Sequence, residues 1–170
     1  IRDSYHALQQ NYYRLNKSAL PQNGKLRASN EPPFWLNIGG ENLATDFYYV
    51  LKNDFQKYRD DISGNLRWAK DVFPNFDQNQ IHQYLDISNL NQLWSDFSCC
   101  TSGYMANMIG TPLVNIFVAL KGPSVLLDFH QMMASGITFQ DAFSKEFGTS
   151  WKEAEPIFEQ IIWDEYQFNY

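Results

Sequence analysis

Residues 111–153 read TPLVNIFVALKGPSVLLDFHQMMASGITFQDAFSKEFGTSWKE, and this stretch decides the fold class. Its apolar residues recur at helical spacing, and a glycine stands at the end of each run, at Gly122, Gly136 and Gly148. Apolar side chains at this spacing, interrupted by glycine, are typical of consecutive amphipathic helices. The sequence therefore predicts three helices in this region and the beginning of a fourth.

The starts of these helices also carry recognisable signals. Thr111 followed by Pro112 predicts an N-cap with proline at the first helical position. Pro123 is expected to begin the next helix in the same way. The last two starts have a cap residue followed three positions later by an acidic residue, as in a capping box: Thr138 with Asp141, and Ser150 with Glu153.

The first half of the chain gives signals of the same kind. Apolar residues at helical spacing indicate a helix that begins at Gly39 or Gly40 and ends near Leu51. Asp77 with Gln80 is a capping-box pattern that opens a shorter helix. No run of four to eight residues alternates between apolar and polar side chains with turn signals on both sides. We therefore expect an all-α fold in which residues 1–170 form a single helical domain.

The composition excludes several classes of protein. The chain has 170 residues, of which 44% are hydrophobic and 16% aromatic, so it is not a disordered or low-complexity chain. Its 13 Lys and Arg against 19 Asp and Glu give a net charge of -6, which is unsuited to binding the phosphate backbone of nucleic acid. No uncharged apolar run reaches the ~18–20 residues that span a bilayer. We expect a soluble protein without a membrane span.

The cysteines and two of the three histidines have ordinary structural interpretations. Cys99 and Cys100 are neighbours in the sequence, where a disulfide rarely forms, and we interpret them as small, half-buried apolar side chains. His82 lies in a polar helix and is expected to be exposed, whereas His130 lies on an apolar helix face and is expected in the core. Nearby carboxylates such as those of Glu153 and Glu155 are interpreted as solvated helix faces. Of the three histidines, only His6 lies within a recognisable motif.

Two short strings near the start of the chain resemble the catalytic half of a gluzincin metallopeptidase of the peptidase MA-like group. They are YHALQ at residues 5–9 and, after a polar loop, PFWLNIGG at residues 33–40. Residues 136–150 are similar to the helical tail of these enzymes. In that family an H-E-x-x-H helix supplies two zinc ligands and the general base, and a later glutamate is the third ligand. The resemblance spans most of the chain and implies the helical half of a zincin.

The sequence departs from this motif at most of its functional positions. Arg2 stands at the first histidine position and Asp3 at the general-base position, so only His6 is retained. Ile38 stands at the position of the third ligand. A guanidinium repels a dication, and an aliphatic side chain cannot coordinate one. The resemblance therefore implies a degenerate metallopeptidase without a zinc cofactor, in which Asp3 is a vestigial general-base position.

Our first interpretation is a non-catalytic, gluzincin-like helical domain. Such a domain could bind a peptide or a protein partner in the vestigial cleft. Tyr5 and Trp35 are the candidate aromatic contacts, although aromatic rings at helical spacing more often belong to the core. The resemblance implies export for many members of the family, and the sequence itself indicates no compartment, partner identity or oligomeric state.

Two alternatives from other classes remain open. The chain could be an active metal-dependent hydrolase whose altered ligand set consists of Asp3, His6 and Glu41, with zinc or a harder metal bound. In the opposing interpretation, Glu41 is an early-helix acidic residue favoured by the helix dipole. The remaining alternative is a helical interaction module that is unrelated to peptidases.

Overall fold

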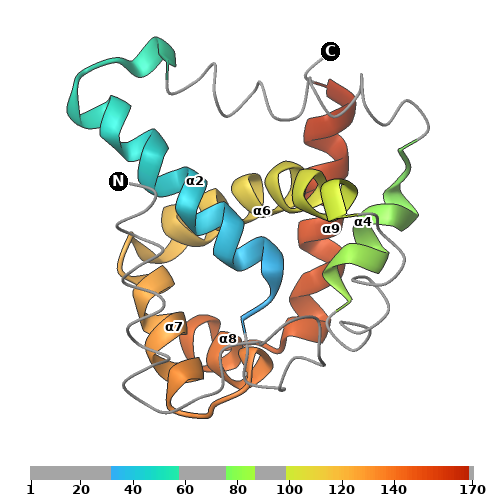
Figure 1. Cartoon of the computed structure of the whole chain (residues 1–170). Coiled ribbons are helices and arrows are strands. Elements are labelled where there is room, and N and C mark those ends of the chain that lie inside the picture. The colour runs from blue at the N-terminus through green and yellow to red at the C-terminus, as the bar shows by residue number, and fades with distance from the viewer. Residues whose placement is uncertain (1–31, 58–75, 87–98, 169–170) are drawn as a thin grey trace.

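The computed structural model of the chain describes residues 32–57, 76–86 and 99–168, and the structural statements below concern these residues. Every regular element within these ranges is a helix, which confirms the predicted all-α fold class. Figure 1 shows the six complete helices: α2 (Phe34–Leu51), α4 (Gln78–Leu85), α6 (Cys99–Lys121), α7 (Val125–Ala134), α8 (Phe139–Phe147) and α9 (Trp151–Phe168).

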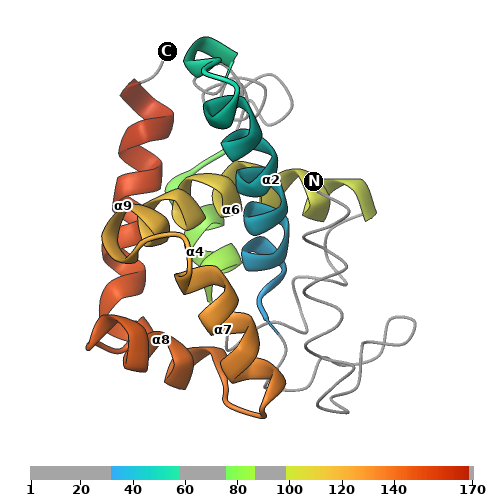
Figure 2. The same ribbon diagram turned by 90° about the vertical axis from the view of Figure 1, so that its left-hand side faces the viewer.

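Helix α6 lies at the centre of the arrangement. It packs along α2, and it also contacts α7 and α9, while α4 packs on α9 and α8 contacts both α7 and α9. Figure 2 shows α2 crossing α6 near the middle of its length and α9 beside one end of α6. No single helix in the described ranges is long and apolar enough to cross a membrane, although Asn107–Lys121 and Val125–Ala134 together, bent by 103°, have the necessary length and composition.

The contact between α2 and α6 depends on two glycines that face each other. A Cβ atom at Gly39 would lie 2.6 Å from the carbonyl carbon of Gly110, and a Cβ atom at Gly110 would lie 3.0 Å from the carbonyl carbon of Trp35. Real Cβ atoms do not approach a neighbouring backbone this closely. One turn further along α2, the Asn42 amide donates hydrogen bonds to Asn107 Oδ1 at 2.6 Å and to Thr111 Oγ1 at 2.9 Å. The two helices therefore pack backbone against backbone beside a polar contact.

The core between the helices is rich in aromatic rings. The indoles of Trp35 on α2 and Trp151 on α9 are stacked, with centroids 5.5 Å apart. Phe117 on α6 packs against rings from α7, α8 and α9, and Phe143 on α8 packs edge-on against Trp151 at 5.1 Å. Rings that meet edge to face or offset add stabilisation beyond their buried area. This aromatic cluster holds five of the helices together.

The predicted helix ends in the second half are confirmed. After α7, the Gly136 amide donates to the Met133 carbonyl at 2.9 Å and the Ile137 amide donates to the Met132 carbonyl at 3.1 Å, which is a Schellman motif. Gly136 and Gly148 have positive φ angles of 99° and 73°, as such ends require. Capping hydrogen bonds are present at the three predicted pairs: Asp77 with Gln80, Thr138 with Asp141, and Ser150 with Glu153.

Two predicted helix starts are wrong. Thr111 is no N-cap, because α6 runs through it and contains Pro112 in its interior. Proline removes one backbone hydrogen bond there, but Thr111 is fully buried and its hydroxyl accepts a hydrogen bond from α2. The second error concerns α2, which begins at Phe34, directly after Pro33, and not at Gly39 or Gly40. The remaining start is close to its prediction, because α7 begins two residues after Pro123.

Candidate functional site

The residues that carried the metallopeptidase resemblance divide into two groups. Arg2, Asp3, Tyr5 and His6 lie outside the described residues, so their roles stay predictions. Trp35, Ile38 and Glu41 all lie on α2. The part of the candidate site that the structure describes therefore lies on α2.

Trp35 is a core residue. Its side chain is 2% exposed, and its ring contacts Phe117 and Phe139 edge-on in addition to stacking on Trp151. A partner could reach this ring only if α2 separated from α6 and α9. Trp35 is therefore not the exposed aromatic contact that we expected. Helical spacing predicts which residues share one face of a helix, but it does not predict which other helices cover that face.

Ile38 and Glu41 lie one turn apart on α2. Ile38 is partly buried and packs against the hydrophobic core. Glu41 is buried as well, next to the Asn42 side chain that bonds to α6. Within the described ranges, no group of three or more His, Cys, Asp or Glu side chains is placed to hold a metal ion. The proposed role of Glu41 in a metal site, which also needs Asp3 and His6, remains a prediction.

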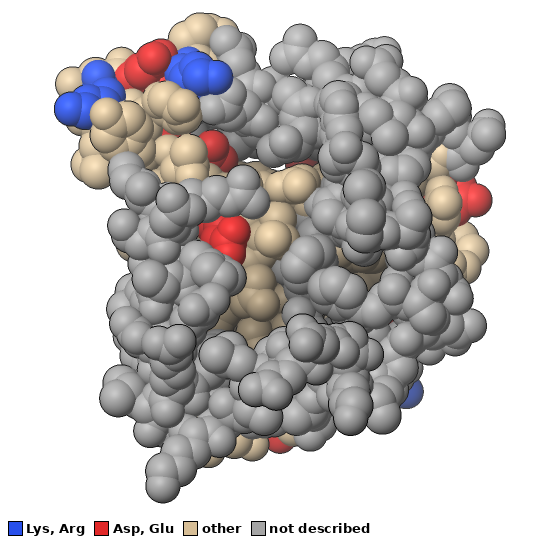
Figure 3. Space-filling view, viewed as in Figure 1, with Lys and Arg blue, Asp and Glu red and all other residues tan. Residues whose placement is uncertain are grey.

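The C-terminal end of α2 presents apolar and basic side chains to solvent. Leu51 is 80% exposed, and Tyr48 and Phe55 are also large exposed hydrophobic residues. Lys52 Nζ lies 5.5 Å from the centre of the Tyr48 ring, and Lys57 has the same relation to Tyr49. We call the set Tyr48, Leu51, Lys52, Phe55 and Lys57 the α2 tip. Figure 3 shows the basic atoms gathered at the upper left corner, where Figure 1 shows this end of α2 extending beyond the other helices.

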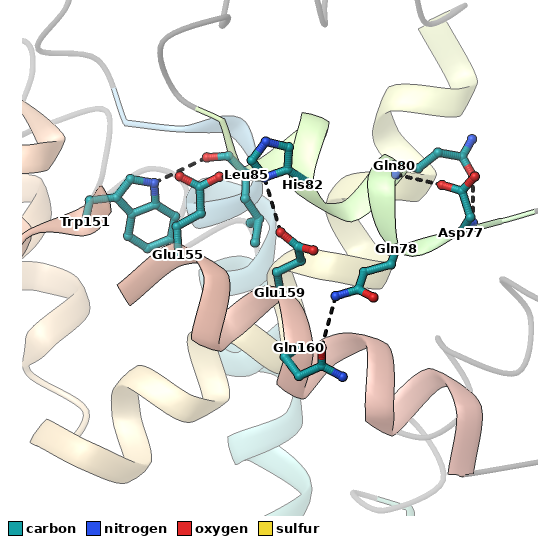
Figure 4. A network of polar contacts seen from close by, with 9 residues as sticks. All are labelled: Asp77, Gln78, Gln80, His82, Leu85, Trp151, Glu155, Glu159 and Gln160. Atoms are coloured by element: carbon teal, nitrogen blue, oxygen red, sulfur yellow. Dashed lines mark hydrogen bonds and ion pairs between the residues drawn. The ribbon is translucent and has the colours of Figure 1, made fainter. Parts of the chain in front are cut away.

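A group of polar side chains lies between α4 and α9, where Figure 4 shows a row of polar contacts. His82 Nδ1 lies 3.2 Å from Glu159 Oε2 and 3.4 Å from Glu155 Oε1. On one side of this cluster, Trp151 Nε1 donates to the carbonyl oxygen of Leu85 at 3.3 Å. On the other side, the Gln78 amide donates to Gln160 Oε1 at 3.1 Å.

Local sequence explains why these groups meet. The Asp77 capping box fixes the start of α4, which places Gln78 and His82 one turn apart on one face. On α9, Trp151, Glu155 and Glu159 follow each other at four-residue spacing and form a matching face. The row therefore joins one face of each helix, and its order along α4 is the reverse of its order along α9.

The members of this cluster differ in how deeply they are buried, and burial shifts the pKa of Glu155. Burial raises the pKa of Glu155, whose side chain is 12% exposed, and Asp86 and Glu159 raise it further, while His82 lowers it. His82 itself is 53% exposed. Carboxylates that face Nδ1 fix the orientation of an imidazole ring and leave Nε2 for other partners. The arrangement therefore joins α4 to α9 through one imidazole and two carboxylates.

The sequence predicted this cluster only in part. The exposure of His82 is confirmed, but the interpretation of Glu155 as a solvated carboxylate is wrong, because α4 covers it. The prediction that His130 lies in the core is confirmed. Its side chain is fully buried, and burial lowers its pKa to about 3. The four-residue spacing of Glu155 and Glu159 was a usable signal, but the approach of α4 to α9 is a long-range contact.

A wide, shallow hollow of about 590 Å³ lies between the end of α7 and α8, lined by Gly136, Ile137, Asp141, Ser144 and Lys145. Among the predicted site residues that the structure describes, neither Trp35 nor Glu41 lines it. Comparisons of the chain with protein-family models, with curated proteins and with solved structures found no match.

Proposed function

We propose that the chain is a non-catalytic, gluzincin-like helical domain that binds a peptide or protein partner through the α2 tip. The observation that carries this proposal is the exposure of Tyr48 and Leu51 at one end of α2 and of Phe55 just beyond it, whereas Trp35 and Leu36 near the other end are buried. Clustered apolar side chains rimmed by polar groups mark interaction sites on protein surfaces. Tyrosine in particular supplies binding energy at the centre of such sites.

The substitutions at the zinc-ligand positions support the non-catalytic part of the proposal. Ile38, at the position where the resemblance expects a glutamate ligand, packs against the core instead of facing an open site. Arg2, at the first histidine position, would place a positive charge beside a dication. A zinc site of this family needs three protein ligands, and the sequence retains one of them in His6.

Selection of peptides on the protein tests the binding surface. A displayed peptide library is selected on the wild type, and the enriched peptides are measured against Leu51→Ser/Phe55→Ser. Leu120→Ser is the control, because Leu120 is exposed near the C-terminal end of α6, nine residues beyond Thr111, to which Asn42 of α2 bonds. We expect the tip variant to lose at least tenfold in affinity and the control to retain it. Equal affinity for all three proteins would contradict the proposal.

Elemental analysis tests the non-catalytic part separately. The full chain is purified without chelator, equilibrated with zinc, and compared with His6→Ala and Glu41→Gln. We expect no stoichiometric metal in any of the three, and melting curves that do not change between zinc and chelator. Stoichiometric zinc in the wild type that is lost in His6→Ala, together with peptide hydrolysis lost in the same variant, would establish the hydrolase alternative.

A further inference from the structure

A second exposed apolar surface lies on α9. Ile157 is 61% exposed and Ile161 is also a large exposed residue, and the two are one turn apart on the helix. They lie away from the face that carries Glu155 and Glu159, because those residues contact α4. We call Ile157 and Ile161 the α9 ridge.

The two surfaces carry opposite charge. The α2 tip has Lys52 and Lys57, and only Asp54 lies between them as an acidic residue. On α9, the exposed Glu153 precedes Ile157 by four residues and the exposed Asp164 follows Ile161 by three, so both lie on the side of the ridge. The charged residues of α9 are one lysine and five acids: Lys152, Glu153, Glu155, Glu159, Asp164 and Glu165. The α2 tip therefore combines apolar side chains with lysines, and the α9 ridge combines apolar side chains with carboxylates. The charges of the two surfaces are complementary.

These surfaces are too far apart to meet within one molecule. Figure 1 shows this end of α2 at the upper left of the structure and α9 at the right. A contact between them needs two molecules.

We propose that the α2 tip of one molecule docks on the α9 ridge of a second copy of the chain. This inference rests on the proposed function, because it uses the same α2 tip and names the partner. The contact is head to tail. In a pair, one molecule keeps a free ridge and the other keeps a free tip, so further copies can add until a ring closes. The two surfaces together expose five large apolar residues, Tyr48, Leu51, Phe55, Ile157 and Ile161, far fewer than the roughly 20–30 residues a side of a standard stable interface. The association is therefore weak, concentration-dependent and weakened by salt.

Two complementary variants test the head-to-tail contact. Leu51→Asp removes the tip and leaves the ridge, while Ile157→Asp removes the ridge and leaves the tip. Both positions are more than half exposed, so neither change disturbs the core. Gln131→Asp, at an exposed position on α7, adds the same charge elsewhere and is the control. Circular dichroism and urea midpoints confirm that all four proteins are equally folded.

Sedimentation velocity over a hundredfold range of concentration gives the readout. We expect the wild type and Gln131→Asp to associate, and each of the other variants alone to remain monomeric. An equimolar mixture of Leu51→Asp and Ile157→Asp should form a one-to-one pair that grows no further, because one intact tip and one intact ridge remain. The pair should weaken at least tenfold between low and high salt.

Several results would overturn this inference. A wild type that is monomeric at every concentration, a mixture that stays monomeric, or the loss of association in only one variant each excludes the tip-to-ridge contact. If Leu51→Asp also abolishes binding to anionic vesicles while the wild type never self-associates, the tip docks on a membrane surface instead. If selected peptides still need the tip in a monomeric wild type, the proposed function stands and only this inference fails.

Discussion

Replacing Gly39 by alanine would insert a methyl group between α2 and α6. The new Cβ atom would lie 2.6 Å from the carbonyl carbon of Gly110 and 2.8 Å from Val114 Cγ2. The Val114 methyl group can shift, but the carbonyl group belongs to the backbone of a central helix and cannot turn aside. The two helices would have to separate.

The expected cost follows from three contributions. Alanine favours a helix interior over glycine by about 1 kcal/mol, and this gain opposes the clash. Overpacking a well-packed contact costs about 1–3 kcal/mol and occasionally more. Separation of the helices also weakens the two hydrogen bonds of the Asn42 amide, each worth about 1 kcal/mol. We therefore expect Gly39→Ala to lower the free energy of unfolding by about 1–3 kcal/mol.

Urea unfolding followed by tryptophan fluorescence measures this change. Gly148→Ala is a useful comparison, because Gly148 has open space around it and a φ of 73°, so its cost of about 1 kcal/mol comes from backbone conformation alone. A Val114→Ala background removes the methyl contact and leaves the carbonyl contact. Gly39→Ala should therefore remain destabilising in that background. A neutral or stabilising effect of Gly39→Ala, or its complete rescue by Val114→Ala, would refute the role of the backbone contact.

Three further predictions concern burial and capping. Burial lowers the pKa of His130 from 6.5 to about 3. As the pH falls, the unfolded state therefore binds this proton before the folded state does. The free energy of unfolding should fall by up to about 1.4 kcal/mol per pH unit between pH 6.5 and pH 3 because of this group. His130→Gln should make the pH dependence of the urea midpoint less steep, and an unchanged slope would contradict this. Burial raises the pKa of Glu155, so the folded state loses stability as the pH rises through that pKa. The melting temperature of Glu155→Gln should therefore rise relative to the wild type between pH 4 and pH 7; a constant difference would count against it. Finally, Thr138→Ala should cost about 1 kcal/mol in urea unfolding by removing the N-cap of α8, whereas Thr138→Ser should cost little, and equal losses would exclude capping as the cause.

The helix ends of the second half could be predicted because local groups determine them. Gly136 and Gly148 adopt positive φ angles that other residues resist, so a glycine after an apolar run identifies the end of a helix. The Thr138 and Ser150 side chains satisfy amide groups within three residues. No distant part of the chain is needed for these contacts.

The errors occurred where a distant helix decided the outcome. Gly39 suggested a helix start, but it is an interior position that lets α2 approach Gly110. Pro112 suggested another start, but the buried neighbourhood of Thr111 keeps α6 continuous. The contacts of His82 with Glu155 and Glu159 could not be predicted either. They depend on the packing of α4 on α9, and the spacing of residues within one helix does not indicate which other helix packs against it.

The division of α2 into a buried and an exposed part makes structural and functional effects separable. Trp35 and Gly39 lie in the half that packs on α6, so changes there should lower stability. Leu51 lies at the other end and is mostly exposed, and exposed substitutions usually change stability by no more than about 0.5 kcal/mol. If α2 had only a structural role, Leu51→Asp would be silent in every assay. A loss of binding in Leu51→Asp without a loss of stability would therefore assign function to this end of the helix, whichever partner occupies it.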